Sequence, residues 1–389
     1  MNKDISFRLY ALAVIRCLQS ASYAISIPFL SIYLYNVRGV PMSLVGSIIG
    51  IASIVGALLR IFVGRLSDIY PTRRIMGLGL CIRSVAFLGF SVLIWLNAHP
   101  WLFIIFFLFN SGGSSFFMTA SDIFVAKNVD EANRPFAYSV LRVGGNVGFA
   151  IGPAVGGFIS KYSYAFTFFM SFVLQVLCLF LLIFMIREDA QEKYVHDNTK
   201  ISLFAIREDK NFLTFTIGTF ILGLLMGQLV STLSVYAKSS GLDNTQIGYL
   251  FSINGFMVVF FQIVLIKFVN LVGYKRGLII GSVLYSIGYF LFSFASKFWH
   301  FSIGVVILTL GEMLAMPLLT TITSMMAPEN KRGLYIGFLG FIDGLSLAIA
   351  PMIGGILVDA FFEIPVLIWG IIAGFGVASM FVFLGVRFK

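Results

Sequence analysis

The amino-acid sequence predicts an all-α integral membrane protein with twelve transmembrane helices in two pseudo-symmetric halves of six helices each. Composition is the first reason for this prediction. The 389 residues are 59% hydrophobic and only 11% charged, with a mean hydropathy of +0.97, whereas soluble domains are about 25% charged. The second reason is an internal repeat spaced at about half the chain length, which is typical of transporters built from duplicated helix bundles.

The two copies of the repeat are residues 133–159, NRPFAYSVLRVGGNVGFAIGPAVGGFI, and residues 331–357, KRGLYIGFLGFIDGLSLAIAPMIGGIL. A shift of 198 residues superposes Pro153 on Pro351 and one Gly-Gly pair on the other. Glycines 144, 148, 152 and 156 recur every four residues, so they share one helix face and let a neighbouring backbone approach closely. Each proline removes a helical hydrogen bond and favours a bend. The residues expected to serve helix packing and bending are Gly148, Gly152, Pro153, Gly156, Gly157 and Pro351.

Twelve apolar segments approach the ~20 residues that a membrane helix needs. They are 8–35, 42–66, 75–96, 101–126, 135–159, 164–186, 212–236, 245–268, 277–296, 301–326, 334–358 and 364–386. An even number places both termini on one side of the membrane. Most of the 27 Lys and Arg residues fall on that side, against only Arg38, Lys161, Lys238 and Lys297 on the other. The positive-inside rule therefore predicts a multi-pass protein of the cell (cytoplasmic) membrane with both termini in the cytoplasm.

The longest polar segment separates the two sets of six spans. We expect an N-terminal half over 1–186, a cytoplasmic linker over 187–211 with a short surface helix around 201–209, and a C-terminal half over 212–389. The net charge of +10 is dispersed between apolar runs, so membrane orientation explains it better than nucleic-acid binding. The three cysteines lie in apolar segments at no metal-ligand spacing, and no metal site is expected.

Three motifs identify a family. The segment 64–74, GRLSDIYPTRR, resembles the G-x-x-x-D-R-x-G-R-R signature of the major facilitator superfamily, although Ile69 and Pro71 depart from it. The glycine-rich stretch 141–157 resembles the G-x-x-x-G-P-x-x-G-G signature of its proton-driven exporters. The segment 309–317, TLGEMLAMP, resembles the acid-bearing span ten of its multidrug exporters. The resemblance covers essentially the whole chain, is closest to the twelve-span drug:proton antiporters, and implies the major facilitator fold.

The resemblance also implies a cytoplasmic gate that holds the outward-open state. In this interpretation the carboxylates of Asp68 and Asp122 share the basic residues around them, and Arg60 and Arg83 are further candidates for the same cluster. The alternative is that the arginines only enforce orientation. The residues assigned to the gate are Gly64, Asp68, Arg73, Arg74 and Asp122.

Two carboxylates lie near the middle of predicted spans, where charge is costly and therefore points to function. Glu312 stands ~18 Å along span ten and Asp343 ~15 Å along span eleven. A dry environment disfavours the charged form of a carboxylate, so each can hold and release a proton, as proton coupling requires. Alternatively, each is neutralised by a partner or permanently protonated.

Arginines and amides complete the expected cavity. Arg16 and Arg142 lie ~12 Å inside spans one and five, and each needs an anion because arginine stays charged. We expect them to face Glu312 and Asp343 across a cavity; the alternative is a fixed ion pair that only stabilises one helix contact. The amides can contact substrate or bond a neighbouring helix. They are Gln19, Asn146, Gln228 and Asn254.

The sequence favours a secondary transporter. It contains no nucleotide-binding loop, and its histidines, His99, His196 and His300, lie near loops rather than in a catalytic or metal cluster. We therefore expect no enzyme activity and no cofactor, with protons as the coupling ion. The leading prediction is alternating-access export of lipophilic, drug-like compounds in exchange for protons, with Glu312 as the main carrier. The alternative is a symporter or exchanger of a small organic anion that uses the intramembrane arginines. The expected partners are the lipid bilayer, a small-molecule substrate and protons, and the expected state is a monomer.

Overall fold

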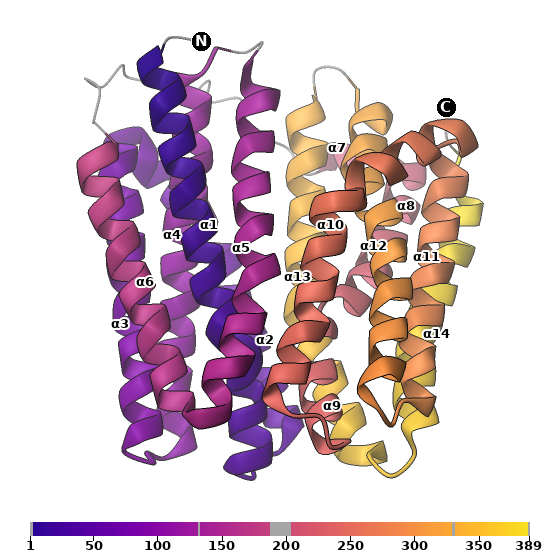
Figure 1. Cartoon of the computed structure of the whole chain (residues 1–389). Helices are drawn as coiled ribbons and strands as arrows, with labels where there is room; N and C mark the ends of the chain where they lie inside the picture. Colours follow the sequence, from indigo (N-terminus) through magenta and orange to yellow (C-terminus); the bar gives the residue numbers. More distant parts are fainter. Residues whose placement is uncertain (1–2, 131–132, 187–203, 329–330, 388–389) are drawn as a thin grey trace. The chain divides into compact units, whose positions relative to one another are not determined.

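The computed structural model describes residues 3–130, 133–186, 204–328 and 331–387. Over these residues the chain is helical throughout, and no β-strand occurs in them (Figure 1). The chain divides into two compact units. Unit 1 comprises residues 1–39, 51–197 and 243–255, and unit 2 comprises residues 40–50, 198–242 and 256–389.

The first six spans are long, nearly uninterrupted helices. They are α1 (Lys3–Ile32, extended by a π-helical turn over Tyr33–Val37), α2 (Met42–Ile69), α3 (Thr72–Trp95), α4 (Phe103–Asn128), α5 (Arg134–Tyr162) and α6 (Tyr164–Met185). Most of the predicted linker lies outside the described residues. Its described end contains the short helix α7 (Phe204–Arg207).

The remaining helices follow the same plan. They are α8 (Lys210–Met226), continued by a π-helical turn over Leu229–Leu233 and by α9 (Ser234–Ser239), then α10 (Asn244–Val272), α11 (Tyr274–Leu291), α12 (Phe298–Met326), α13 (Arg332–Phe361) and α14 (Pro365–Gly385). Prolines interrupt the hydrogen-bond ladder inside α1, α5, α12 and α13.

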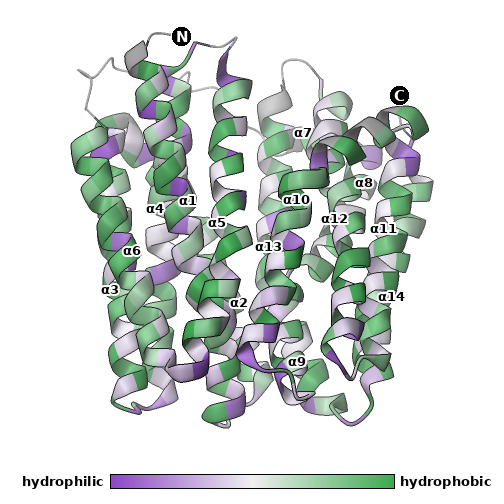
Figure 2. Ribbon diagram, viewed as in Figure 1, coloured by the Kyte–Doolittle hydropathy of each residue, from purple (hydrophilic) through white to green (hydrophobic). Residues whose placement is uncertain are grey.

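Eleven spans in the described part of the chain are long and apolar enough to cross a membrane. The twelfth predicted span, α10, is a continuous helix of 29 residues that is not among those eleven. Figure 2 shows hydrophobic residues along the lengths of the helices and hydrophilic residues mainly towards their ends, as a lipid environment requires.

The glycine face of α5 packs directly on α1 within unit 1. A side chain at Gly148 would overlap the carbonyl oxygen of Cys17, and one at Gly156 would overlap that of Ile25. Gly152 meets α1 between these two contacts. The small residues therefore let the two helix backbones approach more closely than side chains would allow.

The Gly-Gly pairs of the repeat make a second type of contact. In unit 1, a side chain at Gly157 would overlap the carbonyl oxygen of Asn244 at the start of α10. In unit 2, a side chain at Gly355 would overlap the carbonyl oxygen of Met42 at the start of α2. Each pair thus contacts the first turn of a helix within its own unit.

Candidate functional site

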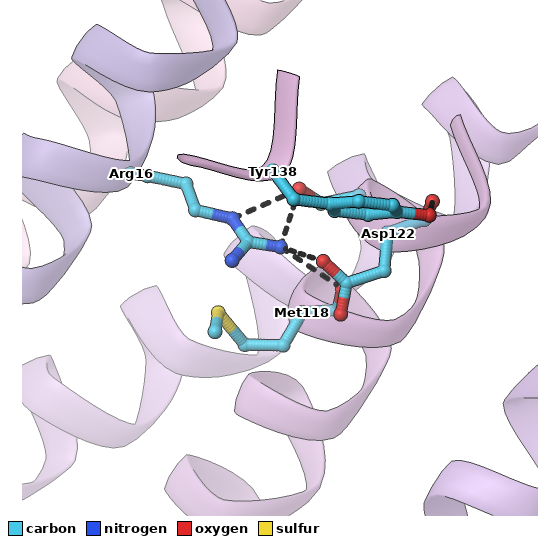
Figure 3. Close-up of polar contacts among 5 residues, drawn as sticks. Arg16, Met118, Asp122 and Tyr138 are labelled. Carbon is cyan, nitrogen blue, oxygen red and sulfur yellow. Dashed lines mark hydrogen bonds and ion pairs between the residues drawn. The ribbon is translucent and has the colours of Figure 1, made fainter. Parts of the chain in front are cut away.

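Arg16 on α1 is bound by α4 through several hydrogen bonds. Its Nε donates to Ser121 Oγ at 3.0 Å, and its Nη2 donates to Ser121 Oγ at 2.9 Å, to the Met118 carbonyl at 3.4 Å and to Asp122 Oδ1 at 2.5 Å. Tyr138 on α5 donates its hydroxyl proton to the Asp122 carbonyl at 3.2 Å. Figure 3 shows these contacts converging where α1, α4 and α5 meet.

The ion pair joins two residues that the sequence assigns to different sites. Arg16 was expected to face Glu312 and Asp343, and Asp122 was expected to serve the gate. In the structure, the Arg16 guanidinium, 11% exposed, is paired with the Asp122 carboxylate, 51% exposed. An ion pair at one helix contact is the alternative that the sequence analysis gives for Arg16.

Arg83 on α3 lies inside unit 1 rather than with the other gate residues. Its side chain is 1% exposed, and its Nε donates to Asn110 Oδ1 at 3.1 Å. Its guanidinium carbon lies 5.9 Å from the ring centroid of Tyr23 and 5.5 Å from that of Phe87. Aromatic faces attract a cation, so an amide and two rings surround this charge. No sequence motif marks Asn110.

Arg73, one of the residues assigned to the gate, ties two helix ends together. Arg73 Nη2, at the start of α3, donates to the Ile183 carbonyl near the end of α6 at 2.7 Å. Unit 2 repeats this arrangement, because Lys275 Nζ at the start of α11 donates to the Leu384 carbonyl at the end of α14 at 2.8 Å. Arg74 is exposed and Gly64 is partly exposed. The Asp68 side chain lies outside the described part of the structure.

Glu312 occupies the interface between α11 and α12 in unit 2. It is half-buried and lies within electrostatic reach of Tyr285 and Tyr289, which are 1% and 0% exposed. A side chain at Gly311 would overlap the backbone of Tyr285, so this glycine brings the two helices together. The Tyr289 hydroxyl donates its proton to the Leu225 carbonyl at 2.6 Å.

Asp343 on α13 is also half-buried. Its backbone carbonyl accepts a hydrogen bond from Ser346 Oγ at 2.8 Å. Its carboxylate has no ion pair or hydrogen bond within residues 3–130, 133–186, 204–328 and 331–387. The repeat places Gly145 at the corresponding position of α5, so the acid is specific to the second copy.

The predicted polar residues of α1 and α5 differ in their surroundings. Arg142 is exposed and Asn146 is partly exposed, and neither side chain has a bonding partner in the described ranges. Gln19 on α1 is only 5% exposed, and its Nε2 likewise lacks a described partner. Of the predicted cavity set in unit 1, Arg142 is the one whose charge is most accessible.

The Gln228 side chain, by contrast, hydrogen-bonds to the backbone of two helices in unit 2. Its Nε2 donates to the Ala350 carbonyl at 2.8 Å and to the Leu224 carbonyl at 3.1 Å. Its Oε1 accepts from Thr232 Oγ1 at 2.6 Å. Gln228 is fully buried, and its amide is bonded to two backbone carbonyls and to Thr232 rather than presented to a ligand. The remaining amide, Asn254, is 4% exposed on α10.

The charge of the intramembrane residues is divided between the units. Unit 1 holds the neutralised Arg16, the ring-enclosed Arg83 and the exposed Arg142, whereas unit 2 holds the half-buried carboxylates of Glu312 and Asp343. A half-buried carboxylate can exchange a proton or hold a cation. No group of three or more His, Cys, Asp or Glu side chains that could bind a metal occurs among the described residues.

Two stretches of the chain, residues 12–265 and 215–388, match the family model of the Major Facilitator Superfamily. Three relatives illustrate the range of similarity. YttB of Bacillus subtilis, an uncharacterized transporter of this type, is 27% identical over 85% of this chain and 83% of its own. A Na⁺, Li⁺, K⁺/H⁺ antiporter of Planococcus maritimus is 24% identical over 99% of this chain and 93% of its own. The class H tetracycline resistance protein of Pasteurella multocida is 28% identical over 37% and 36%.

The fold also matches solved structures. The crystal structure of the nucleoside transporter NupG superposes with a TM-score of 0.80, at 15% sequence identity and with 100% of both chains covered. Similarity at this identity shows the fold alone. Together with the family match, it confirms the predicted superfamily and the predicted all-α membrane fold.

Proposed function

The chain belongs to the major facilitator superfamily of membrane transporters, and we propose that it exports lipophilic, cationic or neutral compounds in exchange for protons. One observation carries this proposal: two half-buried carboxylates, Glu312 and Asp343, lie on the helices of unit 2, and that of Asp343 has no described partner. Such a group can bind either a proton or a cationic cargo, but not both at once, and this competition is the basis of exchange.

The mechanism we propose is alternating access in the cell membrane by a monomer with both termini in the cytoplasm. Protonation of Glu312 from outside displaces the cargo, and deprotonation on the inside restores the charge that attracts it. Asp343 adds a second titrating group or a binding charge. A tenfold proton gradient supplies ~1.4 kcal/mol per proton, which supports about a tenfold gradient of a neutral cargo at one proton per cycle.

The names of the relatives support export and antiport. One is a monovalent-cation/proton antiporter that aligns with 99% of this chain. Another is a tetracycline resistance protein. Exchange of a proton for a cationic cargo needs an acidic group that can bind either one. The carboxylates of unit 2 fit that requirement.

A second candidate function is symport or exchange of a small organic anion. It rests on Arg142, which is exposed and has no partner in the described ranges and can bind a carboxylate bidentately. Arg16 and Arg83 support it less. Arg16 is neutralised by Asp122, and Arg83 is 1% exposed, so neither offers an accessible positive charge to an anion.

Proton flux in liposomes tests the proposal. Purified protein would be reconstituted with an internal pH dye, and lipophilic cations and then small organic anions would be added to the parent, Glu312→Gln and Asp343→Asn. We expect proton movement opposite to a lipophilic compound, lost in Glu312→Gln and weakened in Asp343→Asn. Flux with anions only, or flux unchanged in both variants, would contradict the proposal.

A further inference from the structure

A cavity of about 510 Å³ opens at one end of unit 2, where α10 ends and α11 begins. It lies beside the last turns of α12 and α14, and hence at the same end of the unit as the described C-terminal residues (Figure 1). Gly273 forms the turn with a φ of 86°, and a side chain there would meet no atom within 4 Å. The turn therefore leaves open space at the end of a membrane-spanning bundle.

The polar part of the cavity wall is basic. Lys275, Arg276 and Tyr274 line it, and no Asp or Glu is among its lining residues. Lys275 is fixed in place because its Nζ donates to the Leu384 and Val386 carbonyls at 2.8 and 2.9 Å. Arg276 is exposed, and its side chain makes no hydrogen bond or ion pair with the described residues, so its guanidinium fork is available to an anion.

The rest of the wall is apolar and faces outward. Val272, Ile279, Met325 and Leu384 line it, and Met325 and Leu384 are 51% and 47% exposed on span ends. An aqueous anion such as free phosphate gains nothing from this surface. An amphiphile gains from both parts, because its charged head can meet the cations while its hydrocarbon chains cover the apolar side chains.

We propose that this cavity binds the headgroup of an anionic phospholipid, with the phosphate at Arg276 and an acyl chain along Met325 and Leu384. Basic pockets between membrane helices recognise anionic headgroups through such charge complementarity. The site binds lipid from the leaflet at that end of the bundle. It uses neither Glu312 nor Asp343, so it is independent of the proposed transport function.

The test is lipid binding measured by native mass spectrometry on the full-length protein in mild detergent. Dioleoylphosphatidylglycerol would be titrated against dioleoylphosphatidylcholine, which has the same chains and no net charge. The variants are Arg276→Gln and Met325→Ser. Arg207→Gln is the matched control, because Arg207 is an exposed arginine of the same unit that does not line the cavity. Melting temperatures without added lipid would check that each variant folds.

We expect the anionic lipid to bind about five- to tenfold more weakly to Arg276→Gln and with unchanged affinity to Arg207→Gln. Met325→Ser should also weaken it, and glycerol phosphate, which has the head but no chains, should not displace it. Equal binding by Arg276→Gln and Arg207→Gln would overturn the site. Displacement by inorganic phosphate, with Met325→Ser binding like the parent, would identify a free-phosphate site and overturn the lipid assignment.

Discussion

Arg16 on α1 and Asp122 on α4 form an ion pair with an Nη2 to Oδ1 distance of 2.5 Å. The two partners differ in exposure, because the arginine is nearly buried and the aspartate is about half exposed. Because an arginine in a protein stays protonated, the Asp122 carboxylate is needed to offset the cost of burying the Arg16 charge. The pair thus holds α1 against α4. It also neutralises a positive charge that would otherwise be available to bind an anionic cargo.

Replacing Asp122 by Asn should destabilise the protein. The substitution keeps the size of the side chain and an acceptor oxygen but removes the negative charge that neutralises the Arg16 guanidinium. Breaking a fully buried pair costs about 3–5 kcal/mol, and the exposure of Asp122 reduces this to about 1–2 kcal/mol. Thermal unfolding in detergent measures it. Asp130→Asn, at an exposed aspartate, should leave the melting temperature unchanged; an equal shift in both variants would contradict the account.

Gly148→Ala should prevent normal packing of α5 on α1. The added methyl group would overlap the Cys17 carbonyl oxygen, which is backbone and cannot move aside. Gly145→Ala is the matched control, because its methyl group would enter open space and alanine favours a helix by up to about 1 kcal/mol. Size-exclusion chromatography and melting temperature in detergent would compare the two. Similar behaviour of both variants would show that α5 and α1 are not in this close contact.

Gln228→Leu should destabilise unit 2 because it removes three hydrogen bonds at once. The Ala350 carbonyl and the Thr232 hydroxyl would lose their partner in a fully buried position. We expect a loss of about 1–3 kcal/mol in the free energy of unfolding. Gln262→Leu, which removes a single bond to the Met313 carbonyl at a half-buried site, should cost about 0.6 kcal/mol. Chemical denaturation in mixed micelles would compare them, and a larger loss for Gln262→Leu would be evidence against this assignment.

Arg142→Gln separates the two candidate functions. Arg142 has no described partner to lose, so the variant should fold like the parent. If the cargo is a lipophilic cation, its affinity should stay within about twofold or increase, since a nearby positive charge is removed. Equilibrium binding of a fluorescent lipophilic cation measures this. Loss of organic-anion binding by about tenfold or more in the same variant would instead favour the anion transporter.

Much of the fold could be predicted, because a membrane-spanning helix requires a long apolar segment and because the two copies of the repeat share glycines and a proline at equivalent positions. Gly148 and Gly156 point to close packing because four-residue spacing defines one helix face. The partner of Arg16 could not be predicted, because Asp122 is 106 positions away and helix rotation decides which side chains meet. Gln228 shows the same limit: an amide in a span has the same sequence signal whether it faces a cavity or, as here, a neighbouring carbonyl.

Direct binding as a function of pH tests the central claim, that a proton and a cationic cargo compete for the carboxylates of unit 2. Purified parent, Glu312→Gln and Asp343→Asn would be titrated with tetraphenylphosphonium in weak buffer while a dye reports released protons. Because raising the pH deprotonates a carboxylate, we predict tighter binding at higher pH and proton release on binding in the parent, both abolished in Glu312→Gln. Binding that is independent of pH, or proton release that persists in both variants, would contradict the account.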